Sequence, residues 1–184
     1  MMLAGREGVA QDLNRAFELV EEGVRLGCHH CQGVMALCHL RGYGCVRDAS
    51  RSLELARKSS GNGSRYGHYT LGWLCQYGVG VARCSDKAVA LYGLAAAQNL
   101  DGAQYNLGLM YFQGRVVAQD FAEALRLFQL AAAQGHPEAL FHVAVCHEHG
   151  RGVRKNKAEA IRWYRRAQAA GAFEAAYALQ RLRA

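Results

Sequence analysis

The sequence repeats at an interval of 36 residues along its whole length, and this period constrains the fold more than any other feature. When the chain is aligned with itself at that interval, glycine recurs in four successive units, at Gly42, Gly78, Gly114 and Gly150. Another glycine position recurs at the end of each unit, where Asn99 replaces glycine once. A period of about 20 to 50 residues is typical of solenoid proteins, in which each unit packs against its neighbours.

Each unit contains two segments with helical spacing, separated by a loop. From Ala103 to Gln113 the apolar residues follow one face of an amphipathic helix, which we call helix A. A glycine loop begins at Gly114, and a second helix, helix B, is expected from about Phe121 to Gln134. Gly135 follows, and glycine is the residue that most easily ends a helix in the left-handed conformation. Each unit is therefore predicted to be a helix pair joined to the next pair by a tight turn.

Helix B is expected to begin at a polar N-cap. Asp120 precedes the helix and Glu123 lies three residues later, which is the spacing of a capping box. Asn156 and Glu159 repeat this arrangement one unit later. The side chain of an N-cap residue accepts a hydrogen bond from a free backbone N–H of the first turn. The same cap position is occupied by Asp12 and Asp48 in the earlier units.

The unbroken period predicts an all-α chain of about ten helices that forms one repeat array over residues 1–184. No insertion or deletion is needed to keep the units aligned. Because a single helix pair cannot bury its apolar face alone, neighbouring units must stack. The expected boundaries are a half unit at 5–27, complete units at 28–66, 67–102, 103–138 and 139–174, and a terminal helix at 175–184.

The pattern within a unit resembles the Sel1-like repeat, which is related to the tetratricopeptide repeat. The residues that carry the resemblance are Ala103, Tyr105, Leu107, Gly108, Tyr111, Gly114, Asp120, Ala124, Ala131 and Gly135. The glycine–valine loop of that family is clearest at residues 78–81 and 150–153. The resemblance covers essentially the whole chain. It implies a right-handed α/α superhelical solenoid with an adaptor or scaffold role, and it implies no catalytic residue.

Helix A supplies the candidate partner-binding residues, because helix A lines the concave surface in the related tetratricopeptide architecture. An aromatic ring recurs at the Tyr105 position in successive units, although this position also belongs to the repeat pattern and is expected to pack in most units. Trp73 replaces the leucine or valine of its position, and aromatic anchors supply much of the binding energy at interfaces. The candidate residues are Tyr69, Trp73, Tyr77, Tyr105, Leu109, Phe112, Phe141 and Tyr177.

Positive charge is concentrated after Gly150, within a chain of net charge +7. The candidate basic patch consists of Arg151, Arg154, Lys155 and Lys157. Such a patch attracts acidic partners, but a solvated loop and helix face is the simpler interpretation. Nucleic-acid binding would require exposed aromatic rings among the basic residues, and the nearby Trp163 and Tyr164 fall at core positions of the repeat. We therefore expect no nucleic-acid partner.

The seven cysteines do not pair in step with the repeat. Secreted cysteine-rich relatives carry a bridge in every repeat, so its absence here favours reduced thiols and a cytoplasmic setting. Cys28-His29-His30-Cys31 has the spacing of half a zinc site, but a structural zinc ion needs four ligands and no second Cys-x-x-Cys motif is present. A second cluster, His142, Cys146, His147 and His149, is interpreted as core and surface variation. No metal and no cofactor are expected.

We expect a protein–protein interaction scaffold that binds a partner peptide or domain on the concave helix-A face. The sequence has no phosphate-binding loop between a strand and a helix and no evident nucleophile with a base, so we expect no enzyme activity. No run of about 20 apolar residues is present, so we expect no membrane insertion. One alternative is a structural subunit, or a fragment of a larger multi-domain protein, that assembles through its uncapped repeat ends, including end to end with itself. A metal-binding or enzymatic protein is the remaining alternative.

Overall fold

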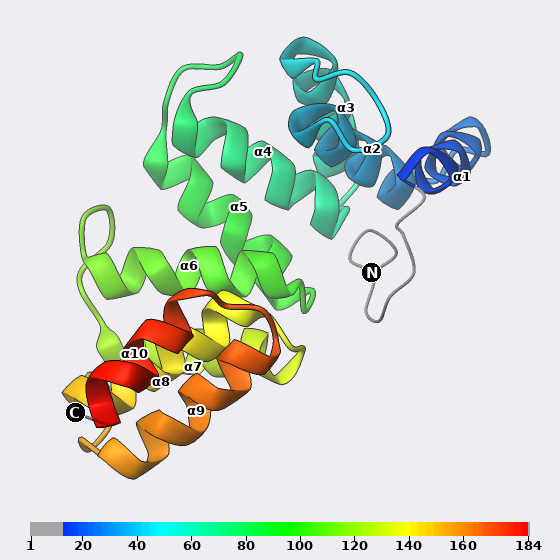
Figure 1. The fold of residues 1–184 in the computed structure, drawn as a ribbon. Helices are drawn as coiled ribbons and strands as arrows, with labels where there is room; N and C mark the ends of the chain where they lie inside the picture. Colours follow the sequence, from blue (N-terminus) through cyan, green and yellow to red (C-terminus); the bar gives the residue numbers. More distant parts are fainter. Residues whose placement is uncertain (1–12, 184) are drawn as a thin grey trace. The chain divides into compact units, whose positions relative to one another are not determined.

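The computed structural model describes residues 13–183, which form ten α-helices and no strands (Figure 1). The even-numbered helices are helix A of their units and the odd-numbered helices are helix B. The prediction of an all-α chain with about ten helices is therefore confirmed. The helices are α1 (Leu13–Arg25), α2 (His29–Arg41), α3 (Ala49–Gly61), α4 (Arg65–Tyr77), α5 (Ser85–Ala97), α6 (Asp101–Gln113), α7 (Phe121–Ala133), α8 (Pro137–His149), α9 (Lys157–Ala169) and α10 (Glu174–Arg183).

Polar caps begin helix B where the spacing predicted them. Asp48 and Asn156 each accept a hydrogen bond from the backbone N–H three residues later. Asp120 Oδ1 accepts from the N–H groups of Ala122 and Glu123, both at 2.9 Å. These bonds satisfy donors that a helix N-terminus otherwise leaves free. The predicted cap at Asp12 lies outside the described residues.

The second half of the predicted capping box is wrong. The Glu123 carboxylate pairs with Arg126 at 2.7 and 2.8 Å instead of accepting from the backbone of Asp120. The Asp120 N–H already donates to the Tyr111 carbonyl in helix A, at 3.0 Å. The same bond, from the residue before helix B to a helix-A carbonyl nine residues earlier, closes the loop in four units. The donor and acceptor pairs are Asp48–His39, Cys84–Cys75, Asp120–Tyr111 and Asn156–His147, at 2.8 to 3.0 Å.

The recurring glycine after helix A is required by the backbone. Gly42, Gly78, Gly114 and Gly150 all lie in the left-handed region, with φ between 64° and 76°, and the N–H of each donates to the carbonyl four residues earlier. An L-residue with a Cβ adopts this conformation only at a cost. Asn99, which replaces the other recurring glycine, also has a positive φ of 59°, because asparagine tolerates that region better than most residues.

The chain divides into two compact units, Met1–Ala95 and Ala96–Ala184. In the first unit, α2 packs against α1, α3 and α4. In the second, α6 to α10 pack in succession, each helix against the next. Ala103, Ala139 and Ala175, which share one repeat position, are fully buried in the second unit. Gly67 holds this position in the first unit, and a Cβ there would lie 2.4 Å from the Ser60 nitrogen. The methyl group that fits the second unit has no room at Gly67, although Cys31 holds the same repeat position in α2.

Candidate protein-interaction surface

Three side chains on the helix-A side of the first unit stack on one another. The Arg41 guanidinium lies 5.0 Å from the centroid of the Trp73 ring, and the Trp73 and Tyr77 centroids are 4.5 Å apart. Trp73 is half-buried, whereas Tyr77 is 57% exposed. A guanidinium over an indole face is a favourable cation–π arrangement. We call Arg41, Trp73 and Tyr77 the aromatic stack.

Two members of the aromatic stack, Trp73 and Tyr77, were predicted from the sequence, whereas the third, Arg41, was not. Arg41 ends α2 and lies 36 residues before Tyr77, so the two residues occupy the same repeat position in neighbouring units. Reading that position along the chain would have found it. Helices α2 and α4 lie against each other, which brings Arg41 beside Trp73.

The recurring aromatic ring of helix A packs on a ring of helix B in its own unit. The centroid distances are 5.9 Å for Tyr69–Tyr92, 5.9 Å for Tyr105–Phe128 and 5.4 Å for Phe141–Tyr164. The helix-B rings are fully buried and the helix-A rings are half-buried. Tyr177 holds the same position in α10 and is 73% exposed. Three of the predicted rings at this repeat position therefore serve internal packing, and Tyr177 differs from them in its exposure.

A second contact between helix A and helix B changes from polar to apolar and back along the chain. The hydroxyl of Tyr92 donates to Gln76 Oε1 at 2.8 Å, and the hydroxyl of Tyr164 donates to Glu148 Oε2 at 2.7 Å. In the intervening unit both positions are phenylalanine, and the Phe112 and Phe128 centroids are 5.9 Å apart. Each hydroxyl is thus matched by an acceptor, as buried polar groups require. Phe112, predicted as a partner-binding residue, takes part in this packing.

A groove of about 490 Å³ in the second unit brings together two predicted residues, Phe141 and Tyr177. Val145 and Ala178 add to its apolar lining, and Arg181 lies on its wall. Arg181 also forms an ion pair with the buried Glu148 carboxylate. Burial, together with the hydrogen bond to Glu148, raises the pKa of the Tyr164 hydroxyl in the same wall, so this group stays protonated and donating. The groove is mainly apolar with a charged margin.

Leu109 is half-buried and packs against the apolar core of the second unit. Tyr105 and Phe112, the other predicted residues of α6, pack against the same core. The three α6 residues are therefore held together with core residues. The most exposed of the predicted residues are Tyr77 in the first unit and Tyr177 in the second.

The predicted basic patch is divided by the structure. The Arg151 guanidinium lies 5.0 Å from the Phe112 centroid and 5.6 Å from the Phe121 centroid, so it packs on two rings. Arg154, Lys155 and Lys157 are exposed. Trp163 is half-buried with Arg166 over its ring at 4.2 Å, and Tyr164 is fully buried. The described surface here does not present the alternating exposed rings and cations that single-stranded nucleic acids use.

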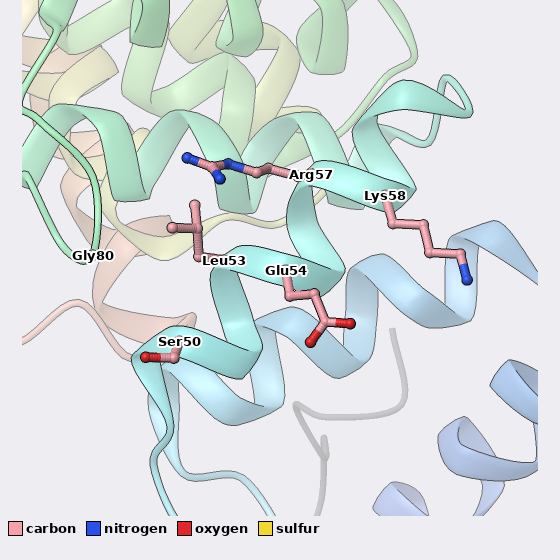
Figure 2. A pocket seen from close by; sticks show the side chains of 6 residues that line it. All are labelled: Ser50, Leu53, Glu54, Arg57, Lys58 and Gly80. Atoms are coloured by element: carbon pink, nitrogen blue, oxygen red, sulfur yellow. The ribbon is translucent and has the colours of Figure 1, made fainter.

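A shallow hollow of about 450 Å³ lies on the helix-B side of the first unit (Figure 2). Leu53 forms its apolar wall, close to Gly80 in the loop after α4. The side chains of Glu54, Arg57 and Lys58, all on α3, lie around it and are exposed (Figure 2). No cysteine or histidine lines this hollow, and the Glu54 carboxylate at its margin accepts a hydrogen bond from Arg51 at 2.7 Å.

His136 and His142 are half-buried and form a cluster with aromatic rings that was not predicted from the sequence. The His136 ring stacks on Tyr105 at 4.7 Å, and its Nδ1 accepts from the backbone N–H of Ala139 at 3.3 Å. Glu138 Oε2 lies 3.2 Å from the same nitrogen, but burial lowers the pKa of His136, so the neutral ring that caps α8 is favoured. His136 is the N-cap residue of α8, and its position in the repeat was the sequence signal that could have predicted this role.

His142 is surrounded by the rings of Tyr105, Phe112, Phe128 and Phe141, at centroid distances of 5.0 to 5.9 Å. Burial lowers its pKa. Its Nδ1 lies 2.9 Å from the carbonyl oxygen one turn earlier in α8 and can donate to it. These contacts show His142 as a ring packed among rings.

The cysteine and histidine clusters do not form a multidentate metal site in the described part of the chain. No group of three or more histidine, cysteine, aspartate or glutamate side chains there is arranged to hold a metal ion. All seven cysteines are free thiols. Cys38, Cys75 and Cys146 are buried, where a thiol acts as a small apolar side chain. None of the helices in residues 13–183 is both long and apolar enough to cross a membrane.

The fold and its repeating contacts define a helical repeat solenoid. The family model of the Sel1 repeat matches residues 1–28, 24–64, 65–100, 102–136 and 137–171. The chain therefore belongs to the Sel1 repeat family. Proteins with this fold are typically non-catalytic protein–protein interaction scaffolds. Among curated proteins, no significant match is found.

Solved structures with the same fold include a Sel1 repeat protein from Oxalobacter formigenes, with 25% identity and a TM-score of 0.76. The match covers 98% of this chain and 52% of that protein. A protective antigen of uropathogenic Escherichia coli strains, which displays an SLR fold, is 26% identical with a TM-score of 0.75, over 97% of this chain and 38% of that one. The chain thus spans about half or less of these relatives. Cysteine-rich protein B of Helicobacter pylori shares the fold at 19% identity, with a TM-score of 0.57 over 72% of this chain and 96% of that one.

Proposed function

We propose that this chain is a scaffold that binds a partner peptide or protein domain on its helix-A face and carries out no catalysis itself. The observation that carries the proposal is the aromatic stack of Arg41, Trp73 and Tyr77. Tyr77 is 57% exposed although it is a large aromatic residue, and Trp73 beneath it is already ordered by the Arg41 guanidinium. Preordered aromatic and arginine side chains lose little entropy on binding and are the residues most enriched among binding hot spots.

The test uses the full chain as bait, beside a Trp73→Ala/Tyr77→Ala double variant and a Tyr43→Ala control. Tyr43 lies in the loop after α2 and is 38% exposed, so the control removes a surface ring outside the aromatic stack. We expect partners captured by the parent chain to be lost from the double variant and retained by the control. Hot-spot truncation costs about 2 kcal/mol or more, so affinity for a purified partner should fall by about tenfold or more.

Full partner retention by a folded double variant would exclude the aromatic stack as the binding surface. Circular dichroism of each variant establishes that the helices are intact. Tyr105 and Phe141 are unsuitable for this test, because their rings pack on helix B and on His142. Alanine at either position would disturb packing and binding together.

We propose, as a second candidate, assembly through the face of α10, including association with another copy of this chain. Tyr177 supports this candidate, since it is 73% exposed at a position whose ring packs on helix B in the earlier units. Light scattering over a range of concentrations should show association that Tyr177→Ala weakens. A monomer at all concentrations would count against self-association.

We also propose an intracellular setting, which the seven free thiols support.

A further inference from the structure

Two cysteines meet at the start of α2. Cys28 is the N-cap of the helix, with φ −68° and ψ 110°, and its Sγ accepts a hydrogen bond from the Cys31 N–H at 3.3 Å. Both residues are partly accessible. Cys28 is therefore held over the first turn, on the side where Cys31 projects.

The space for the second thiol is provided by α1. Gly23 of α1 lies against Cys31, and a Cβ on Gly23 would be 2.4 Å from the Cys31 Sγ. Glycine at this point lets the thiol enter the packing between α1 and α2. The pair thus consists of one thiol at the helix terminus and one that packs against a neighbouring helix while remaining partly accessible.

The two thiols differ in pKa, because Cys28 lies at the helix terminus and Cys31 packs against α1. Hydrogen bonds from the Cys31 side chain and backbone lower the pKa of Cys28. Burial, followed by the bond with Cys28, raises the pKa of Cys31 to about 11. A thiol whose pKa is lowered at a helix N-terminus, beside a second thiol, is the arrangement in which Cys-x-x-Cys pairs exchange with disulfides, because a lowered pKa increases the fraction of the attacking thiolate.

We propose that Cys28 and Cys31 are a redox-active dithiol that undergoes exchange with low-molecular-weight disulfides. This activity is independent of partner binding on the helix-A face. It also gives the Cys-x-x-Cys motif a role that needs no metal, in keeping with the two thiols having no further metal-binding side chains grouped with them in the described residues.

The exchange proceeds in two displacements. The Cys28 thiolate attacks one sulfur of a disulfide R–S–S–R, forms a Cys28–S–S–R mixed disulfide and releases R–S⁻. The Cys31 thiol then gives its proton to the released thiolate and attacks the Cys28 sulfur, which closes the Cys28–Cys31 disulfide and releases the second R–S⁻. Two protein thiols are oxidised by two electrons, and one small disulfide is reduced to two thiols.

The backbone at Cys28 permits this closure. Residues three apart on a helix have Cβ atoms about 5–6 Å apart, whereas a disulfide requires about 3.5–4.5 Å. Cys28 has extended torsions, and its carbonyl accepts the first helical bond from the Gln32 N–H at 3.1 Å, so closure can proceed by movement of the Cys28 side chain while that bond is kept. Closure gives up the N-cap bond to Cys31, which makes the disulfide easier to reduce than a relaxed structural bridge.

The test is performed on the full reduced chain in buffers of reduced and oxidised glutathione, quenched by alkylation and analysed by peptide mass spectrometry. We expect the parent chain to lose two hydrogens in the peptide that holds Cys28 and Cys31. The Cys31→Ser variant should accumulate glutathione on Cys28 faster than on Cys84, which is an exposed thiol of the same chain. Cys28→Ser should form neither product at this site, and serine preserves an N-cap, so the helix is retained.

The pH dependence supplies a second measurement. Alkylation of Cys28 in the Cys31→Ala and parent chains should show a lower midpoint in the parent, because Cys31 hydrogen bonds favour the Cys28 thiolate. The proposal is overturned if the folded parent chain forms no Cys28–Cys31 disulfide under conditions that glutathionylate Cys84. It is equally overturned if Cys28 in Cys31→Ser reacts no faster than Cys84, or if bound zinc protects both thiols from oxidised glutathione.

Discussion

Replacing Gly67 by alanine sets the repeat pattern and the structure against each other. Gly67 on α4 occupies the position of Ala103 and Ala139, so the pattern predicts that alanine is tolerated or stabilising. Helix propensity alone would favour alanine over glycine by about 1 kcal/mol. In the structure, however, a Cβ at Gly67 would lie 2.4 Å from the Ser60 nitrogen and 2.6 Å from the Ser59 carbonyl carbon. We therefore predict that Gly67→Ala destabilises the first unit.

The magnitude follows from what the new methyl group meets. An ordinary contact requires at least about 3.4 Å, so α3 and α4 must separate by up to about 1 Å at this point, since backbone atoms cannot rotate away as a side chain can. Inserting a methyl group into a packed core costs about 1–3 kcal/mol, and a backbone obstacle places this case in the upper part of that range. After the gain in helix propensity of about 1 kcal/mol, the net loss in the free energy of unfolding is about 1–2 kcal/mol.

Urea denaturation followed by circular dichroism measures this loss against a matched control. Gly93→Ala in α5 is the control, because a Cβ there meets nothing within 4 Å, and we expect it to stabilise the chain by up to about 1 kcal/mol. The two substitutions are chemically identical and should have opposite signs. If Gly67→Ala proves as stable as the parent while Gly93→Ala behaves as expected, the close approach of α3 and α4 is refuted.

Three further substitutions or conditions test separate contacts. Burial lowers the pKa of His136 and His142 below the ordinary value of 6.5, so the unfolded chain binds more protons than the folded chain as the pH falls below about 6.5. The free energy of unfolding should therefore be highest above about pH 6.5 and decrease as the pH falls. Urea titrations at several pH values should show a smaller decrease for His142→Phe. Tyr164→Phe removes the 2.7 Å bond to the buried Glu148 and should lower the free energy of unfolding by about 1–2 kcal/mol, with no loss arguing against that bond. Asp120→Ala should cost about 1 kcal/mol through its N-cap bonds, whereas equal stability of Asp120→Ala and Asp120→Ser would contradict the capping role.

Much of the fold was predictable because it depends on local backbone geometry repeated along the chain. Gly114 and its equivalents end helix A in a conformation that disfavours other residues, and Asp120 and its equivalents begin helix B. The second half of the predicted capping box was wrong, because the Asp120 N–H donates its hydrogen bond to the Tyr111 carbonyl. That acceptor is nine residues away across a loop, so a local spacing rule does not include it.

The candidate surface was only partly predictable. The repeat position identifies which residues lie on helix A, but it does not state which rings helix B covers. Tyr105 packs on Phe128, whereas Tyr77 stays exposed beside Trp73. The difference depends on side chains from other helices, and on whether each ring finds a partner of matching size and polarity.

The sequence by itself determined the helix–loop–helix unit, the number of units and their alignment along the chain. The reason is that the positions of glycine, the N-cap residues and the apolar stripes follow from the geometry of single helices. Only the tertiary structure decided the contacts between helices. It placed Arg41 over Trp73, left no room for a methyl group at Gly67, and packed Cys31 against Gly23 of α1 while leaving Cys28 at the helix terminus. Such differences arise because packing depends on distances between residues that are far apart in the chain, to which a repeated spacing contributes nothing.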